Sequence, residues 1–314
     1  MAAAAATAGE GEVDLRAIVT DVGAGQLREP LRYCIAVDGS ELSLRTFHAA
    51  AMLCCRGDHV TVLHIADPGK TYLPYDMRPS SIREQYDVEC VGRFPKSNYS
   101  IVVKNKRLGE STRTAVLDAV NNGTFDVFCV GMVGRKGPKD SPTVLGSTAD
   151  YSMRGAHCTS VVVKGRGADF PKSGPFVVAC DGSRKSLFCI RQVLTMANDD
   201  DEIRVVHVSQ RDQEGLRPQF RATAVKEAAE AVAAGDKRFS FEFIEHGTDT
   251  TIADTLAEYA AEAGALYVAM GADGVAAFAA GKYVGLGSVS DRLVKVARCS
   301  AIVTQDSERL MGSP

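Results

Sequence analysis

Several features that would place the chain in a familiar class are missing from its 314 residues. No apolar run approaches the ~20 residues needed to cross a bilayer. The Ala-rich N-terminus has neither the basic segment nor the Leu/Val-rich segment of a secretory signal. The net charge is only −3, whereas binding to a phosphate backbone needs clustered Lys and Arg. We therefore expect a cytoplasmic protein that binds neither membranes nor nucleic acids.

Cysteine and histidine are present, but not in metal-binding patterns. None of the nine cysteines forms a CxxC pair, and the six histidines show no HExxH spacing, so we expect no metal site. Cys34, Cys129 and Cys180 lie in apolar runs, where a thiol packs as a small hydrophobe. The neighbours Cys54 and Cys55 end a helical pattern. We interpret them as reduced structural thiols, with a redox role as the alternative.

Catalytic signatures are missing as well. The chain has no Gly-x-Ser-x-Gly elbow, no His-Ile-Gly-His signature and no Ser-Gly-Gly-x-Asp-Ser signature. Gly274 and Gly281-Lys282 resemble a P-loop only superficially, because six residues separate the glycines and Tyr283 replaces the Ser/Thr that would hold Mg²⁺. No general base for phosphoryl transfer stands out. We expect a protein that is not an enzyme, with any ATP hydrolysis slow and incidental.

What the chain does contain is a long internal repeat. Tyr33–Ser40 reads YCIAVDGS and recurs as FVVACDGS at Phe176–Ser183, and the offset of 143 holds through residues 64 and 207. Leu145–Ser147 recurs as Leu286–Ser288 with an offset of 141. A repeat of this length is a whole domain rather than a solenoid unit. The sequence therefore predicts one domain duplicated in tandem.

In each copy, short apolar runs alternate with segments of helical periodicity. Strands are predicted at 31–37, 60–65, 99–103, 126–130, 159–164, 176–180, 203–208, 239–244, 266–270 and 301–304. Helices are predicted at 40–54, 111–120, from about 146, and at 184–197, 219–234, 250–263 and 287–298. Near-continuous apolar strands separated by helices are typical of parallel sheets covered on both faces. The fold class is α/β, with two tandem doubly wound, five-stranded parallel-sheet domains.

The remaining segments set the domain boundaries. Residues 1–29 are predicted to be a flexible N-terminal arm, 30–166 the first domain, 167–174 a linker, 175–306 the second domain and 307–314 a tail. Within the first domain, residues 66–98 contain four prolines and are predicted to be irregular, with a short helix near 81–92.

Polar and glycine motifs follow the strands, at the sheet edge where open parallel sheets bind ligands. Asp38 and Asp181 end the first strand of each copy; each is either a turn residue or an acceptor for an adenine amine or ribose hydroxyl. Glycines follow the fourth strand and let a backbone approach a sugar or phosphate. Ser147 and Ser288 begin helices whose free amides would bind phosphate, and each is also interpreted as an N-cap.

Together these motifs resemble the universal stress protein family. They are Val37-Asp38-Gly-Ser, Val62-Leu-His64-Ile65 and Gly131-x-x-Gly134…Gly146-Ser147, repeated as Cys180-Asp181-Gly-Ser, Val205-Val-His207-Val208 and Gly271-x-x-Gly274…Gly287-Ser288. The likeness covers about residues 31–165 and 175–305. It implies the adenine-nucleotide α-hydrolase-like fold. It also implies that the last strands, 160–164 and 300–304, pair within the chain as an intramolecular pseudo-dimer.

The resemblance also implies ligand contacts, because family members with the glycine motif bind ATP. In the first domain the implied contacts are Ala36, Asp38, Ile65, Val130, Gly131, Gly134, Gly146, Ser147 and Thr148. In the second they are Ala179, Asp181, Val208, Met270, Gly271, Gly274, Gly287, Ser288 and Val289. The aspartates would contact adenosine, the apolar residues the base, and the glycines and hydroxyls the ribose and phosphates. The implied ligand is ATP or AMP, with Mg²⁺ as a companion of ATP.

Both copies depart from the family pattern, which places nine residues between the second and third glycines. The first copy has eleven and the second has twelve. The first loop carries Arg135, Lys136 and Lys139, which would neutralise phosphates, whereas the second has Asp273 between its glycines. A carboxylate there repels a triphosphate. We therefore predict that the first site binds nucleotide better than the second, which takes AMP or nothing.

The leading functional hypothesis is an adenine-nucleotide-binding regulatory protein of the universal stress type. Nucleotide would order the long glycine loops and change the surface offered to a protein partner. The alternative is a structural or scaffold subunit of a larger assembly, in which nucleotide is a stabiliser or absent. In that case residues 66–98, the tails and the glycine loops would be docking surfaces.

Overall fold

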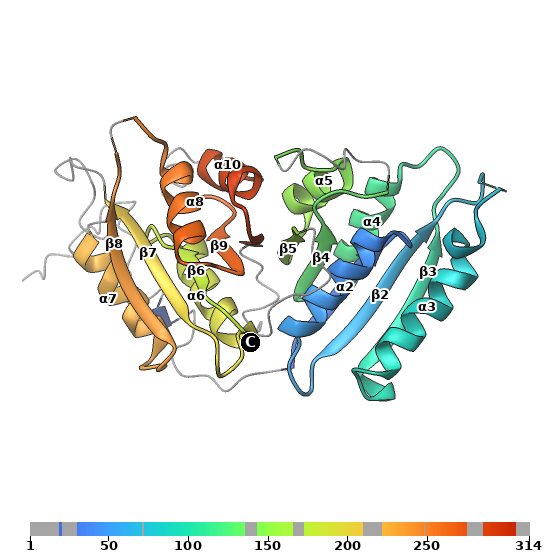
Figure 1. The fold of residues 1–314 in the computed structure, drawn as a ribbon, viewed down its shortest axis with the longest axis horizontal. Coiled ribbons are helices and arrows are strands. Elements are labelled where there is room, and N and C mark those ends of the chain that lie inside the picture. Colours follow the sequence, from blue (N-terminus) through green and yellow to red (C-terminus); the bar gives the residue numbers. More distant parts are fainter. Residues whose placement is uncertain are drawn as a thin grey trace, which may run out of the picture.

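The computed structural model describes residues 19–20, 30–70, 72–135, 143–165, 173–209, 222–247, 249–274 and 285–305. Its strands are β1 (Arg32–Val37), β2 (His59–Ala66), β3 (Tyr99–Asn105), β4 (Val127–Gly131), β5 (Thr159–Val163), β6 (Phe176–Ala179), β7 (Ile203–Ser209), β8 (Phe239–Glu245), β9 (Tyr267–Gly271) and β10 (Ser300–Thr304). They form one ten-stranded sheet in the order β3-β2-β1-β4-β5-β10-β9-β6-β7-β8. Figure 1 shows the two halves of this sheet side by side.

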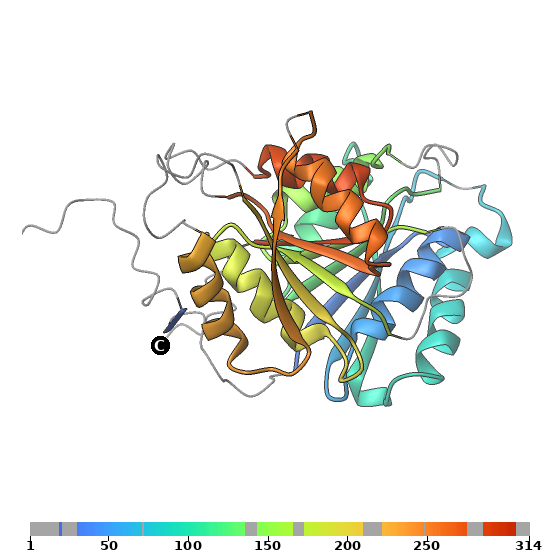
Figure 2. The same cartoon turned by 60° about the vertical axis from the view of Figure 1, so that its left-hand side comes forward.

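Helices cover both faces of the sheet (Figure 2). They are α2 (Glu41–Leu53), α3 (Pro79–Val91), α4 (Thr112–Asn121), α5 (Ser147–Gly155), α6 (Arg184–Met196), α7 (Ala222–Ala233), α8 (Ile252–Glu262) and α10 (Ser288–Val296). One hydrophobic core lies under α2, α3, α6 and α7, and a second lies under α4, α5, α8 and α10. Within each domain the described strands pair in parallel. The predicted α/β class with two doubly wound domains is confirmed.

The two domains meet through their last strands. β5 and β10 pair antiparallel, with Val161 opposite Ile302. This pairing joins two five-stranded sheets into one and satisfies the backbone groups of two strands that would otherwise form exposed edges. The expected pairing of 160–164 with 300–304 is therefore confirmed.

Polar contacts that involve α5 and α10, which lie on the same face of the sheet, reinforce this junction. Arg154 of α5 forms an ion pair with Asp291 of α10, and these helices lie close together at the top of Figure 1. Lys164, directly after β5, donates from Nζ to the carbonyl oxygen of Ala297 at 2.6 Å, just beyond the C-terminal end of α10. Gln305, directly after β10, donates to the carbonyl of Met153 in the opposite domain. Equivalent positions thus cap opposite helices across the junction.

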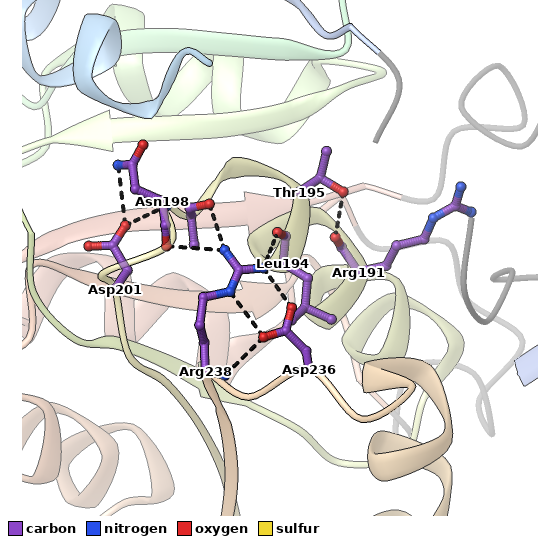
Figure 3. Close-up of polar contacts among 8 residues, drawn as sticks. Arg191, Leu194, Thr195, Asn198, Asp201, Asp236 and Arg238 are labelled. Carbon is purple, nitrogen blue, oxygen red and sulfur yellow. Dashed lines mark hydrogen bonds and ion pairs between the residues drawn. The ribbon is translucent and has the colours of Figure 1, made fainter. Parts of the chain in front are cut away.

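At the amino end of β8, in the second domain, Arg238 forms a cluster of polar contacts (Figure 3). Its guanidinium pairs with the carboxylate of Asp236, with Nη2 2.6 Å from Oδ2. The same group donates to the carbonyl oxygens of Leu194, Ala197 and Asn198. These carbonyls lie at the C-terminal end of α6, where a cation also interacts favourably with the helix dipole. Arg238 therefore has a structural role in holding the C-terminal end of α6 to the start of β8.

Residues 66–98 are more regular than the sequence predicted. They contain two short 3₁₀ turns, Tyr75–Met77 and Lys96–Asn98, and the thirteen-residue helix α3, which begins at Pro79. The buried residues Ile82 and Tyr86 pack α3 against the first core. The helix expected near 81–92 exists, but the interpretation of the segment as mainly irregular is wrong.

Some predictions fall outside the described residues. Of the predicted arm only residues 19–20 are described, of the predicted linker only 173–174, and of the tail none. The domain boundaries therefore stay predictions. Lys136 and Lys139, and the second domain's loop at 275–284, also lie outside the described ranges. None of the described helices has the length and apolar content to cross a membrane.

Candidate functional site

A cavity of about 440 Å³ opens at the carboxyl ends of β1, β2 and β4. All nine residues proposed as ligand contacts in the first domain line it: Ala36, Asp38, Ile65, Val130, Gly131, Gly134, Gly146, Ser147 and Thr148. They come from four separate stretches of sequence and meet because parallel strands end at one edge of the sheet. The structure thus brings together every residue of that set.

The cavity has further walls that sequence reasoning did not identify. The segment after β2 contributes Asp67, Lys70, Leu73, Met77 and Pro79, and α4 contributes Thr112 and Val116. Thr112 and Val116 are four residues apart on one helix, so they share a face. The helical periodicity of 111–120 could have revealed that face, but no sequence signal places it at the cavity.

Asp38 anchors the glycine turn to the end of β1. Its Oδ1 accepts hydrogen bonds from the backbone N–H and the hydroxyl of Ser40, at 3.1 and 2.6 Å, and its Oδ2 accepts from the Arg135 N–H at 2.8 Å. Burial pushes the pKa of Asp38 upward, but these hydrogen bonds to the charged form outweigh it and lower the pKa overall. A carboxylate held in this way is ionised at neutral pH and faces the cavity as an acceptor.

His64 lies next to Asp38 and is oriented by the backbone. Its Nδ1 donates to the carbonyl oxygen of Val37 at 3.0 Å, as His207 does to Cys180 at 2.8 Å in the second domain. Burial lowers the pKa of His64, so the ring is neutral at neutral pH. Among the described residues no group of three or more potential metal ligands occurs. The backbone hydrogen bond gives both histidines a structural role at the ends of their strands.

The start of α5 forms the polar end of the cavity. Gly146 is its N-cap residue, and no side chain caps the helix there. The predicted N-cap role of Ser147 is therefore wrong, as it is for Ser288, which follows the N-cap residue Gly287 of α10. The first-turn amides of α5 keep the partial positive charge of a helix N-terminus and border the cavity.

Close backbone contact favours glycine at this position. A Cβ on Gly146 would lie 3.1 Å from the Met132 carbonyl oxygen and 3.2 Å from the Val133 Cα. The Gly146 N–H donates to that same carbonyl at 2.8 Å. The second and third glycines of the motif are thus packed against each other, which brings the start of α5 next to the turn that Asp38 holds.

Two cations, Arg135 and Lys70, and a second carboxylate, that of Asp67, complete the lining of the first site. Arg135 reaches Met77 with its guanidinium, Nη1 to Sδ at 3.2 Å, so the glycine turn and the segment after β2 meet across the cavity. Asp67 forms an ion pair with Lys106 at 3.1 Å and lies 3.9 Å from Lys70. The Lys106 hydrogen bond lowers the pKa of Asp67. Asp67 is therefore also ionised at neutral pH.

The second domain repeats much of this framework. Asp181 Oδ1 accepts from the Ser183 N–H at 3.0 Å, and the Gly287 N–H donates to the Ala272 carbonyl at 2.7 Å, as Gly146 does to Met132. A Cβ on Gly274 would collide with Asp181 Oδ2, so these two residues of the proposed set are in close contact. Ala179, Val208 and Met270 pack with the second core, and Gly271 ends β9. Val289 follows Ser288 in the first turn of α10 and is partly exposed.

One feature of the second site was missed from sequence. Asp273 does not stand alone between its glycines: its Oδ2 lies 2.6 Å from Nζ of Lys185, in the first turn of α6. The two positions are 88 residues apart, so no local pattern links them. The repulsion between Asp273 and a ligand's phosphates, predicted from the sequence, is therefore partly offset by the Lys185 ammonium.

Comparisons with known proteins agree with this geometry. The sequence model described as the universal stress protein family matches residues 32–164 and 173–305. No curated protein matches the sequence. Among solved structures, a universal stress protein from Archaeoglobus fulgidus DSM 4304 is similar at 16% identity and a TM-score of 0.57, over 87% of this chain and 98% of that one.

Two further structures share the fold over nearly the whole chain. A protein of unknown function from Pseudomonas aeruginosa PAO1 has 12% identity and a TM-score of 0.60, over 93% of this chain and 96% of that one. The cytoplasmic domain of a prokaryotic cation chloride cotransporter has 14% identity and a TM-score of 0.50, over 90% and 99%. At such identities the likeness shows the arrangement of the two domains and nothing about ligands.

Proposed function

This chain belongs to the universal stress protein family, and we propose that it is an adenine-nucleotide-binding regulatory protein whose main site is the cavity of the N-terminal domain. The observation that carries the proposal is the convergence on that one cavity of all nine residues that the family resemblance implies, from four separate stretches of sequence. The ligand would be ATP or AMP, with Mg²⁺ accompanying ATP.

The lining of the cavity fits the parts of an adenine nucleotide. Its volume is within the range of about 300–1,000 Å³ typical of small-molecule sites. Ala36, Ile65 and Val130 present apolar surface for a base, and the Asp38 carboxylate is an acceptor for its amine or for ribose hydroxyls. The close-packed glycines and the uncapped amides of α5 suit phosphates. Arg135 and Lys70 add positive charge.

We propose that catalysis is absent or slow. A general base must reach the proton it removes and be free to accept it. Of the carboxylates lining the cavity, Asp38 already accepts from Ser40 and Arg135, and Asp67 is paired with Lys106. His64 donates through Nδ1 to a backbone carbonyl, which leaves Nε2 as its acceptor, and burial lowers the pKa of the ring and so makes it a weak base. The lining is suited to binding and positioning a charged ligand rather than to activating water.

A thermal-shift titration of the purified chain with ATP, ADP, AMP and cyclic AMP tests the proposal. Ligand that binds only the folded state stabilises it by RT ln(1 + [L]/Kd), about 2.7 kcal/mol at one hundred times Kd. We expect a saturable rise in melting temperature of several degrees, and nucleotide released on denaturation. A chain that is indifferent to all four and copurifies with a protein at fixed stoichiometry would instead be a scaffold subunit. Steady turnover lost in Asp38→Ala would show an enzyme.

A further inference from the structure

An ion pair distinguishes the C-terminal site from the N-terminal one. The Lys185 ammonium lies 2.6 Å from the Asp273 carboxylate, and the two side chains are only 14% and 15% exposed. When Asp181 is aligned with Asp38 and Gly271 with Gly131, the equivalent residues in the first domain are Leu42 and Val133. The first domain therefore has two apolar side chains where the second has two opposite charges.

The pair lies against the part of the site that would hold phosphate. A Cβ on Gly287, the N-cap residue of α10, would be 3.3 Å from the Asp273 Cα. A Cβ on Gly271 would be 2.8 Å from the Lys185 Cβ. Asp273 thus stands beside the start of α10, and Lys185 joins that position to the first turn of α6. A phosphate at the α10 amides would have the Asp273 carboxylate as a close neighbour.

Such a pair acts on ligand charge and hardly at all on ligand shape. The carboxylate repels every negative charge that a phosphate chain brings to the start of α10. The Lys185 ammonium cancels part of this repulsion, but a phosphate can bind the ammonium itself only by displacing the carboxylate, and both groups are largely shielded from solvent. An uncharged nucleoside meets neither effect. In the first domain Val133 carries no charge, and Arg135 adds a cation to the lining.

We propose that the Lys185–Asp273 ion pair makes the C-terminal site select its ligand by charge. The site accepts adenosine, and it binds ATP only when phosphate displaces Asp273 from Lys185. This inference rests on the proposed function, because it assumes that the fold of each domain binds adenosine compounds. It assigns the two domains different ligands and identifies Lys185 and Asp273 as the residues that set the difference.

Photolabelling of the full-length chain with 2-azido-ATP and 2-azidoadenosine tests this assignment, because peptide mapping reads the two domains separately. In the unaltered chain we expect 2-azido-ATP to label the N-terminal domain at lower concentration than the C-terminal one. Asp273→Asn removes the negative charge at nearly constant shape and leaves the Lys185 ammonium available to phosphate. It should lower the half-saturating 2-azido-ATP concentration for the C-terminal peptides about tenfold, with 2-azidoadenosine labelling unchanged.

The matched variant is Val133→Asp, which places the carboxylate in the first domain without its lysine. It should raise the half-saturating 2-azido-ATP concentration for the N-terminal peptides by about tenfold or more and leave 2-azidoadenosine unaffected. Circular dichroism first verifies that both variants are folded. The inference is overturned if, in the domain that carries the substitution, Asp273→Asn and Val133→Asp leave the half-saturating concentration of 2-azido-ATP unchanged relative to that of 2-azidoadenosine. This includes the case in which a substitution shifts the values for both probes equally. Saturable labelling of the N-terminal domain alone with unresponsive variants defeats this inference only. No saturable labelling in either domain defeats the proposed function as well.

Discussion

At the scale of single residues, Asp38 connects the strand end, the first helix and the glycine turn. Its three hydrogen bonds come from Ser40 and from the Arg135 backbone. Removing such an acceptor leaves the turn without its anchor as well as removing a ligand contact. The repeat gives a natural control, because Asp181 occupies the same place in the second domain.

We predict that Asp38→Ala lowers ATP affinity at least about tenfold and the free energy of unfolding by about 2 kcal/mol, because hydrogen bonds to a charged acceptor are lost. Calorimetric titration and denaturant unfolding measure the two effects. Asp181→Ala should reduce ATP affinity less. If it reduces ATP affinity more than Asp38→Ala does, the predicted difference between the two sites is wrong.

Lys164 provides a residue-scale prediction on pH. Burial lowers its pKa to about 8 in the folded chain, compared with about 10.4 in an unfolded one. Below pH 8 both states hold the proton and the fold bears the full cost of burying the charge. Between about pH 8 and 10.4 the folded chain has released it while the unfolded chain has not, so stability rises with pH.

The rise should be about 1–3 kcal/mol relative to Lys164→Gln, the residue found at the equivalent position 305. Urea unfolding of both proteins between pH 7 and 10.5 measures it, and the variant corrects for other titrating groups. Parallel stability curves for the two proteins would show that burial of Lys164 does not set its protonation.

Sequence could identify residues whose place is fixed by local motifs. Asp38, Gly131, Gly134 and Gly146 follow strands or start a helix, so strand order alone brings them together. It could not find Lys185, whose partner Asp273 is distant in the chain. It also assigned the α5 cap to Ser147 rather than Gly146, because propensity favours serine at an N-cap whereas close packing favours glycine here.

At the scale of elements, α3 shows where hydrophobic periodicity was insufficient to predict the full extent of a helix. Its buried positions Ser81, Ile82, Tyr86 and Cys90 are mixed in character, and the outward-facing Val88 is 74% exposed. No side chain caps its N-terminus, and Pro79 marks its start. Strands β2, β5 and β10, in contrast, are near-continuous apolar runs buried on both faces and were predictable from composition.

The packing of α3 on the turn after β1 gives an element-scale prediction. A Cβ on Gly39 would lie 2.8 Å from Cδ1 of Ile82 in α3, whereas a Cβ on Gly109 would meet nothing within 4 Å. Both glycines have nearly the same positive φ, +79° and +80°, so Ala costs similar backbone strain at each. Gly39→Ala should destabilise the chain by about 1–3 kcal/mol more than Gly109→Ala. If chemical denaturation shows equal losses of unfolding free energy for the two variants, α3 shifts to accommodate the added methyl group at little cost, and the prediction is wrong.

At the scale of the whole molecule, the β5–β10 pairing makes one sheet from two domains. Sequence repetition and the family resemblance were enough to expect this pairing, because the last strands are apolar and equivalent. Lys164 caps α10 of the second domain, and Gln305 caps α5 of the first. These contacts could not be predicted from sequence, because they depend on how the two domains pack against each other.

Because the two edges satisfy each other internally, we predict that the full chain sediments as a 33.4 kDa monomer. A fragment covering residues 30–166 would expose β5, a short and fully buried apolar strand, and should self-associate through it. Analytical ultracentrifugation of both proteins checks this. A monomeric fragment, or a full-length dimer that persists on dilution, would contradict the assigned role of the β5–β10 junction.

The central claim is that the N-terminal cavity binds an adenine nucleotide. The most direct measurement is isothermal titration calorimetry of the full chain with ATP, beside Ala36→Phe, which fills the apolar end of the cavity. The account predicts saturable binding with one dominant site per chain, abolished in the variant while the melting temperature of the ligand-free protein stays close to that of the unaltered chain. Absence of saturable binding, or ATP binding that survives Ala36→Phe unchanged, would contradict it.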